Sequence, residues 1–464
     1  MSVLNAIINN LPEVKGPSQK YLSFKTKITW TLIILVSYFI LGVIPLHGLG
    51  DNALKNFDFL SIILGAQFGS LISLGIGPIV TASIVLQLLM GSGILKIDTS
   101  THEGRVFFQG LQKVSSIFFI LFEAAIYVLL GGLSPAAGFS PWYLVFQLCL
   151  GGLLIMLMDE VVNKWGIGSG LSLFIAAGVS AEVFIQIFSP LTTTGAFFVG
   201  SGQAPVGRIL VIFLSLFQGS VESMKTALIA FSEIAATAIV FLLVVYVQAM
   251  KVEIPLSFGR IRGYGIRWPL KFIYTSNIPV ILVAALMANF QLWARLLESW
   301  GRPILGTFSG NTPATGFVTW IFPPNIVRNL FSGTFASIDL AHALTYILFM
   351  IIGAVIFSIF WVQTSGMDAA SQSRQILNSG LQIPGFRRDE RVLEAILKRY
   401  ITPLTVMGGA TVGLLAATAD LSGALSRGTG ILLTVMIIYK FYEDIAKQHM
   451  MDMNPAMKKF MGGS

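Results

Sequence analysis

About ten apolar runs, each close to the length needed to cross a bilayer, occupy most of this 464-residue sequence. A spanning helix needs roughly 20 apolar residues, and charged residues or Gly and Pro bound each run. With 55% hydrophobic and 11% charged residues, a water-soluble domain would expose large apolar patches. The sequence therefore predicts an all-α polytopic membrane protein, with spans at about 28–46, 70–91, 113–131, 142–160, 168–190, 229–250, 270–294, 340–363, 401–419 and 429–446.

Several classes of protein are disfavoured by the sparse reactive side chains. The single cysteine, Cys149, allows neither an internal disulfide nor a cysteine-based metal site. The four histidines lie far apart and form no HExxH pair, which argues against a zinc hydrolase. We expect no enzyme activity, no metal and no cofactor. The N-terminus lacks the pattern of a cleaved signal peptide and is predicted to be a short amphipathic helix followed by a basic linker.

The distribution of charge predicts the orientation of the chain. If the N-terminus is cytosolic and the spans alternate, most of the 30 Lys and Arg fall on the cytosolic side, as the positive-inside rule requires. Two cytosolic loops, 251–271 and 367–400, hold much of this excess. Both are longer than a connector needs and carry arginines spaced by glycine, a pattern suited to phosphate contacts with an RNA-rich partner or to orientation alone.

The order of the spans predicts two halves of opposite orientation. Five spans precede a polar external stretch and five follow it, and inverted halves recur in transport proteins. No residue-level repeat is visible, so the inference rests on topology. The predicted segments are an amphipathic cytosolic N-terminal segment (1–27), an N-terminal half (28–190), an external hinge segment (191–228), a C-terminal half (229–446) and a cytosolic tail (447–464).

The stretch "FDFLSIILGAQFGSLISLGIGPIV" is unusual, because an apolar piece too short to span precedes a helix that restarts at Gly75, Gly77 and Pro78. Non-helical backbone at membrane depth is tolerated only inside protein or beside water. Pro loses no hydrogen bond at a helix start, and glycines permit close backbone approach. The segment is thus either a re-entrant loop before a kinked span or a small, removable helix that fills a cavity between helices.

Several runs together resemble one family. "LGIGPIVTASIVLQLLMGSG", "DEVVNKWGIGSGLSLFIAAGVS", "VEIPLSFGRIRG", "SNIPVIL", "FQLWARLLESWGRPILG" and "KRYITPLTVMGGATVGLLA" are similar to the SecY family, the channel subunit of the general secretory translocon, in its archaeal and eukaryotic branch. The resemblance covers essentially the whole chain. It implies two five-helix halves that open like a clam around a central hourglass pore, which is closed by a plug and narrowed by a ring of aliphatic side chains.

The resemblance also implies roles for individual residues. The ring corresponds to Ile76, Val80, Leu171, Ile175, Ile281 and Leu433, and the plug, at about 57–67, includes Phe57, Phe59, Leu60, Ile62, Ile63 and Leu64. Ile76 and Val80 are four apart and would share one helix face. Six aliphatic residues in spans are by themselves more typical of core packing. Their motif positions favour the ring, whose apolar constriction would resist wetting while closed.

A lateral gate between spans two, three, seven and eight is implied as the route by which signal sequences and membrane segments reach lipid. Thr81, Glu123 and Asn277 correspond to a polar cluster there, although Glu123 could equally serve helix packing. Arg260, Arg262, Arg387 and Arg388 would contact the ribosome. The implied partners are a SecE (gamma-type) subunit, a small beta-type subunit, the ribosome, nascent chains with signal sequences, and the lipid of a cell membrane.

Two other classes of protein share some of these sequence features. An ion-coupled secondary transporter also has inverted halves and broken helices, but usually places ionisable groups at mid-membrane. Here Glu123 is the clearest internal carboxyl, because Asp159, Glu160, Asp420 and Glu443 sit near predicted span ends and Glu233 near a span start. A membrane protease is less favoured, since Ser169 in "GIGSG" has no histidine convincingly beside it.

Overall fold

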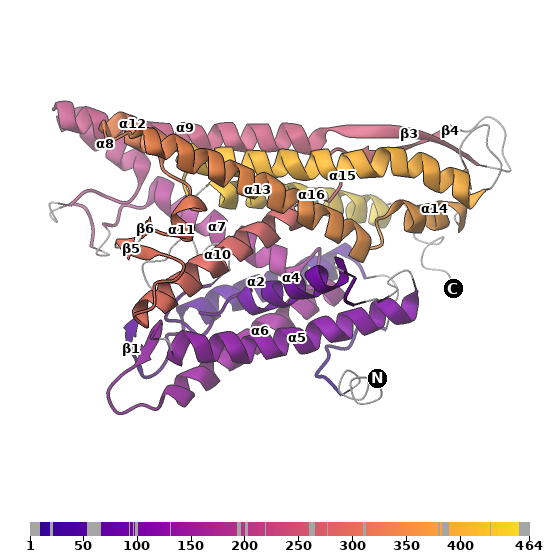
Figure 1. Ribbon diagram of the computed structural model, residues 1–464, viewed down its shortest axis with the longest axis horizontal. Helices are drawn as coiled ribbons and strands as arrows, with labels where there is room; N and C mark the ends of the chain where they lie inside the picture. Colours follow the sequence, from indigo (N-terminus) through magenta and orange to yellow (C-terminus); the bar gives the residue numbers. More distant parts are fainter. Residues whose placement is uncertain are drawn as a thin grey trace.

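The structure, a computed structural model, is a bundle of long helices (Figure 1). It describes residues 10–18, 22–52, 66–91, 93–95, 97, 101–129, 131–192, 196–199, 203–218, 220–258, 265–275, 277–309, 312–378, 381–382, 389–426 and 428–453.

Each of the ten predicted spans coincides with a helix. Eight helices of the described chain are long and apolar enough to cross a membrane by length and composition, and the all-α polytopic fold is confirmed. The helices at the ten spans are α2 (Phe24–Val43), α4 (Gly77–Gly91), α5 (His102–Leu129), α6 (Pro141–Trp165), α7 (Gly170–Phe188), α9 (Val221–Ala249), α10 (Ile278–Ser299), α13 (Ser337–Thr364), α15 (Glu390–Leu421) and α16 (Gly428–Met453).

The helices differ from the predicted spans mainly at their ends. α5 and α15 each begin eleven residues before the predicted span, and α9 begins eight residues before it. Hydropathy finds only the apolar part of a helix, whereas backbone hydrogen bonding continues into polar residues outside the membrane. α4 instead begins late, at Gly77, because residues 71–76 form consecutive turns.

The two ends of the bundle carry different small elements. At the end where α9 begins lie α8 (Arg208–Gln218), α11 (Phe317–Trp320) and α12 (Ile326–Ser332) (Figure 1). Two antiparallel strand pairs lie there as well, β1 (Leu49–Asn52) with β2 (Leu133–Pro135) and β5 (Thr307–Ser309) with β6 (Thr312–Thr315). At the opposite end lie α14 (Ala369–Asn378) and an antiparallel sheet ordered β4-β3-β7, formed by β3 (Lys251–Phe258), β4 (Gly265–Lys271) and β7 (Leu381–Gln382).

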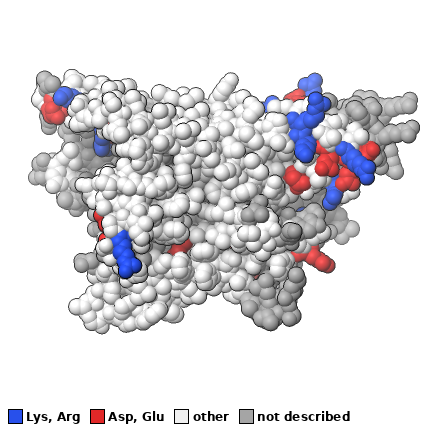
Figure 2. Space-filling model, viewed as in Figure 1, with Lys and Arg blue, Asp and Glu red and all other residues white. Residues whose placement is uncertain are grey.

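Charged side chains gather toward these two ends, and the middle of the visible face is almost entirely white in Figure 2. Large apolar side chains stay exposed along the helices, as with Val43 at 80% and Leu242 at 66%. Exposed apolar surface on this scale is stable only in lipid. The bundle therefore crosses the membrane several times.

The N-terminal and C-terminal halves form two groups of helices, drawn purple and orange to yellow in Figure 1. They meet along two lines: α7 packs on α16, and α4 packs on α10 and α13. One continuous hydrophobic core, which includes Ile34, Ile175, Ile281 and Leu433, crosses between them.

The turns before α4 are held by backbone contacts. The Leu71 N–H donates to the Ile44 carbonyl at the end of α2, and the Leu46 N–H donates to the Gly69 carbonyl, both at 2.9 Å. Gly151 of α6 allows the same turns to approach closely, because a Cβ at this position would lie 1.8 Å from the Leu71 carbonyl oxygen. The non-helical entry to α4 is thus enclosed by protein, as backbone at membrane depth requires.

We predict that Gly151→Ala destabilises the fold by about 1–3 kcal/mol, the usual penalty for overpacking, because the turns before α4 must move. Thermal unfolding of the purified protein in detergent measures the effect as a lower midpoint. Gly178→Ala in α7 is the matched control, since its nearest neighbour, the Tyr38 hydroxyl, would lie 3.7 Å from the new Cβ. Equal midpoints for the two variants would contradict the close contact at Gly151.

Candidate functional site

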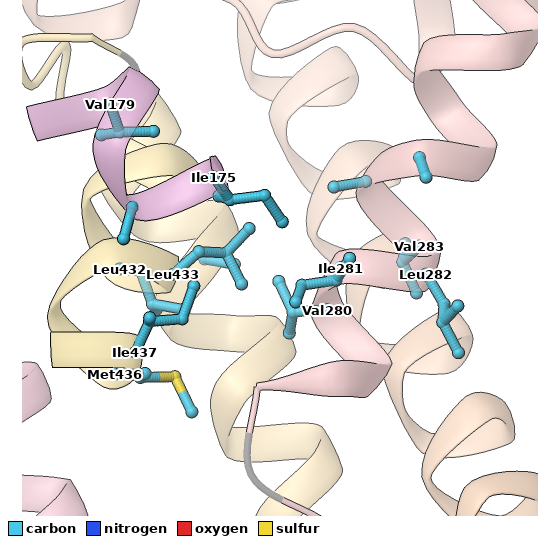
Figure 3. Close-up of a cluster of buried hydrophobic side chains, with 14 of the residues drawn as sticks. Ile175, Val179, Val280, Ile281, Leu282, Val283, Leu432, Leu433, Met436 and Ile437 are labelled. Carbon is cyan, nitrogen blue, oxygen red and sulfur yellow. The ribbon is translucent and has the colours of Figure 1, made fainter. Parts of the chain in front are cut away.

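The structure places the six predicted ring residues in or against one hydrophobic core. Ile76 and Leu433 are fully buried, Ile175 is 1%, Val80 3% and Ile281 9% exposed, and all five belong to the core shared by the two halves. Leu171 is half-buried and packs against the same core. Figure 3 shows Ile175 of α7, Ile281 of α10 and Leu433 of α16 converging on one another.

Each of these residues lies at or near the start of a helix. Ile76 precedes α4 by one residue, and its carbonyl accepts the Val80 N–H at 3.1 Å, so that the two side chains share one face. Val80 follows Pro78 by two residues, and Ile281 follows Pro279 by two residues in the first turn of α10. Proline is favoured in the first turn because it has no N–H to leave unpaired. The two helices therefore present their ring residues from equivalent positions.

Aspartates of preceding helices hold the starts of the other two helices. The Leu171 N–H of α7 donates to Asp159 Oδ1 of α6 at 2.9 Å, and the Thr429 N–H of α16 donates to Asp420 Oδ1 of α15 at 2.8 Å. The Tyr346 hydroxyl and the Thr429 hydroxyl also donate to Asp420 Oδ2. Carboxylates at helix starts satisfy free N–H groups and complement the helix dipole.

Glycine at the first position of α7 and of α16 lets each helix start pack closely against the helix that precedes it. A Cβ on Gly170 would lie 2.6 Å from Asp159 Cα, and one on Gly428 would lie 2.0 Å from the Ala419 carbonyl carbon. Ile175 follows Gly170 by five residues, as Leu433 follows Gly428. A local structural repeat thus relates the two halves. The repeat is not visible in the sequence, because only Gly and Asp recur and their spacing differs between the halves.

The predicted polar cluster is only partly assembled. Thr81 and Glu123 are buried and interact, and Asn289 Nδ2 of α10 donates to Thr81 Oγ1 at 3.1 Å. Asn277 lies twelve residues before Asn289, or about 18 Å along a helix at 1.5 Å per residue, where it precedes the first turn of α10. The structure therefore pairs Asn289, rather than Asn277, with Thr81.

The sequence around Asn289 already indicates a buried polar contact. Asn289 lies inside "VILVAALMANFQLW", where an amide is costly unless it is paired. The family resemblance implied Asn277 instead, which the structure places at the start of α10. Thr81 also donates to the Gly77 carbonyl at 2.9 Å, so its oxygen is free to accept the Asn289 amide.

Two predicted groups lie outside the described residues. These are the six plug residues, Phe57 to Leu64, and the four arginines of the cytosolic loops, Arg260, Arg262, Arg387 and Arg388. The strands beside the arginines are described, and β3 pairs with both β4 and β7, with Phe258 opposite Leu381. This pairing joins the two basic loops, which are far apart in the sequence, into one sheet.

Known proteins of one family match this chain over most of its length. Residues 70–442 match the SecY family. The chain is 46% identical to the protein translocase subunit SecY of Methanothermobacter thermautotrophicus, with 97% of each chain covered, and 44% identical to that of Pyrococcus horikoshii, with 99% of each covered.

Solved structures agree with these relatives. One, described as a protein conducting channel, superposes with a TM-score of 0.82 at 41% identity, covering 98% of this chain and 99% of that one. Another, Sec61 in a canine ribosome-channel complex from the endoplasmic reticulum, has a TM-score of 0.79 at 41% identity, with the same coverage.

We predict that the Thr81–Asn289 hydrogen bond helps to hold the α4–α10 contact closed. Spin labels on the exposed residues Leu88 of α4 and Ile352 of α13 report the distance between the halves by pulsed electron paramagnetic resonance spectroscopy. Thr81→Val and Asn289→Leu should each widen the distribution of this distance. A double-mutant cycle on the free energy of unfolding, with Thr81→Val, Asn289→Leu and both together, should give a coupling energy of about 0.5–1.5 kcal/mol between the two side chains.

Thr405→Val in α15 is the control for this prediction, because the buried Thr405 donates to the Ile401 carbonyl of its own helix, at 2.7 Å. Equal distance distributions for Thr81→Val and Thr405→Val would show that the contact between the halves does not depend on the Asn289 amide.

Proposed function

This chain belongs to the SecY family, and we infer that it is the channel-forming subunit of a protein translocase, through which unfolded polypeptides cross the membrane and from which apolar segments leave sideways into lipid. It conducts polypeptides and is not an enzyme. The observation that carries this function is that Ile175, Ile281 and Leu433 converge at the boundary of the two halves (Figure 3), with the other three predicted ring residues in or against the same core.

The proposed conducting path runs between these six residues. An aliphatic constriction is hard to wet, so it limits ion flow while closed. Branched apolar side chains form no directional bonds with a substrate, so polypeptides of unrelated sequence can pass. Each residue belongs to a helix start that can move with its own half, which would let the constriction widen without breaking a helix.

The proposed plug is the segment at about 57–67. Its sequence, "FDFLSIILGAQ", is apolar and short, and the described turns that follow it are enclosed against α2 and α6. A short apolar element tethered beside the ring would leave the path when a polypeptide enters. We place the lateral gate between α4 and α5 of one half and α10 and α13 of the other, where α4 packs on α10 and α13.

The cytosolic partner proposed for this channel is the ribosome. The Sec61 relative was solved in a ribosome-channel complex. In this chain both basic loops adjoin the β4-β3-β7 sheet, so the four loop arginines would act as one phosphate-binding surface. We also propose a SecE (gamma-type) subunit that clamps the halves, a small beta-type subunit, and cytosolic N- and C-termini in the cell membrane.

A photo-crosslinking residue at Ile281 tests the conducting path. In membranes with ribosomes stalled on a secretory chain, crosslinks should appear only with the stalled chain and should move along it as its length changes. The same probe at Trp293 of α10, which is 40% exposed on the same helix, serves as control. Labelling at Ile281 that ignores the nascent chain but is blocked by a small solute would favour a solute transporter.

We predict that Leu171→Gly combined with Ile281→Gly raises the ion leak of the resting channel, because the constriction loses two of its six aliphatic side chains. Single-channel conductance in a planar bilayer measures the leak. The control pair, Phe184→Gly and Trp293→Gly, makes the same change at exposed positions of α7 and α10. Unchanged conductance in the ring variant, or an equal rise in the control, would remove these residues from the constriction.

A further inference from the structure

Two adjoining cavities lie at the end of the bundle where α8, α9 and α12 meet (Figure 1). One is polar, has a volume of about 150 Å³, and is lined by Arg208, Glu233 and Arg328. The other is apolar, with a volume of about 530 Å³, and follows α9 and α15. Ser232, Val327 and Ser422 line both, so the two form one continuous groove with a polar head and an apolar tail.

Small side chains form part of the apolar section, and large exposed ones stand beside them. Ala235, Ala236 and Ala419 line it together with Phe231, which is 62% exposed, and Ile239, which is 57% exposed. The lining on α9 runs from Leu228 to Leu243, about 22 Å at 1.5 Å per residue. A narrow apolar channel of this length, open to the bilayer, suits a hydrocarbon chain.

Two arginines and two carboxylates line the polar section, and the guanidinium groups are the more exposed of these charges. Glu233 Oε2 lies 2.5 Å from Arg208 Nε, and Glu233 Oε1 lies 3.6 Å from an Arg328 guanidinium nitrogen. The Glu233 side chain is 13% exposed, whereas those of Arg208 and Arg328 are 31% and 54% exposed. The second carboxylate, Asp420, is only 5% exposed, and its oxygens already accept hydrogen bonds from α13 and α16. The exposed Arg328 guanidinium is therefore the charged group most accessible to a ligand, and it keeps donors for an anion.

The depth of this cluster matches the level of lipid headgroups. Glu233 lies only four residues, about 6 Å, inside the start of the apolar run at 229–250. Arg side chains at such a depth extend to the interface, where lipid phosphates lie. The apolar section then continues from the cluster toward the middle of the membrane.

We propose that this groove binds an anionic phospholipid, with its phosphate on Arg328 and Arg208 and one hydrocarbon chain between α9 and α15. The charge and the shape together select this occupant. A free phosphate would leave the apolar section empty, and an apolar helix of another protein would offer no anion to the exposed Arg328 guanidinium. The proposal requires only that the chain spans a membrane, so it does not depend on polypeptide conduction.

Photo-crosslinking with lipids tests the proposal. The translocase complex, reconstituted in nanodiscs, is exposed to phosphatidylglycerol carrying a photoactivatable acyl chain, and labelled peptides are mapped by mass spectrometry. We expect labels on the α9 and α15 positions that line the groove, and several-fold weaker labelling with the phosphatidylcholine analogue. Equal labelling by both lipids would overturn the proposal.

Two matched pairs of variants separate the head from the tail. Arg328→Gln should weaken phosphatidylglycerol labelling about tenfold, as expected for the loss of a charge-assisted contact, whereas Lys225→Gln, an exposed cation on α9 outside the groove, should not. Ala235→Leu should block the tail, whereas the same change at the exposed Ala238 on α9 should not. Wild-type labelling in both Arg328→Gln and Ala235→Leu would overturn the site.

A photo-crosslinking amino acid at Ile239 distinguishes a lipid from a protein occupant. A lipid-sized mass adduct supports the proposal, and a crosslinked polypeptide, whether a partner subunit or a second copy of this chain, contradicts it. Because translocation is measured in the same nanodiscs with a secretory substrate, a failure of the lipid site would leave the proposed conduction function unaffected.

Discussion

The structure depends on one constraint, the need of every backbone polar group at membrane depth to find a partner within the protein. Helices that begin inside a bundle expose unpaired N–H groups at their first turn. This chain meets the constraint in two ways, each used once in each half. α4 and α10 begin with proline, which removes a donor, and α7 and α16 begin beneath an aspartate of the preceding helix, which accepts one. The four helix starts that carry the proposed ring are thereby fixed.

The proposed ring and the proposed gate rely on different forces. The ring is held by apolar burial shared between the halves, which has no preferred direction and tolerates sliding. The contact between α4 and α10 includes a specific buried hydrogen bond, from Asn289 to Thr81. A single bond of this kind contributes only about 1 kcal/mol net, so it can define the closed arrangement without making opening costly.

The two lines of contact between the halves are not alike. α7 and α16 pack closely, because Gly168 lies against Phe441, which a Cβ at Gly168 would approach to 2.3 Å, and because the Ser426 N–H before α16 donates to Gln186 of α7 at 3.1 Å. On the other side, α4 meets α10 through the hydrogen bond from Asn289 to Thr81, and a cavity of about 740 Å³ is lined by residues of both α4 and α13. This asymmetry suits a hinge on the α7–α16 side and an opening on the α4–α10 side.

The sequence by itself determined the membrane class, the ten helices and the two opposed halves, because hydropathy and charge bias are local properties of the chain. Motif positions also predicted six aliphatic residues that lie in or against one core. Only the tertiary structure decided that Asn289, not Asn277, reaches Thr81, that Asp159 and Asp420 hold equivalent helix starts, and that the two basic loops share a sheet. These are contacts between residues distant in sequence, and their partners are chosen by how helices cross, which no local pattern of residues specifies.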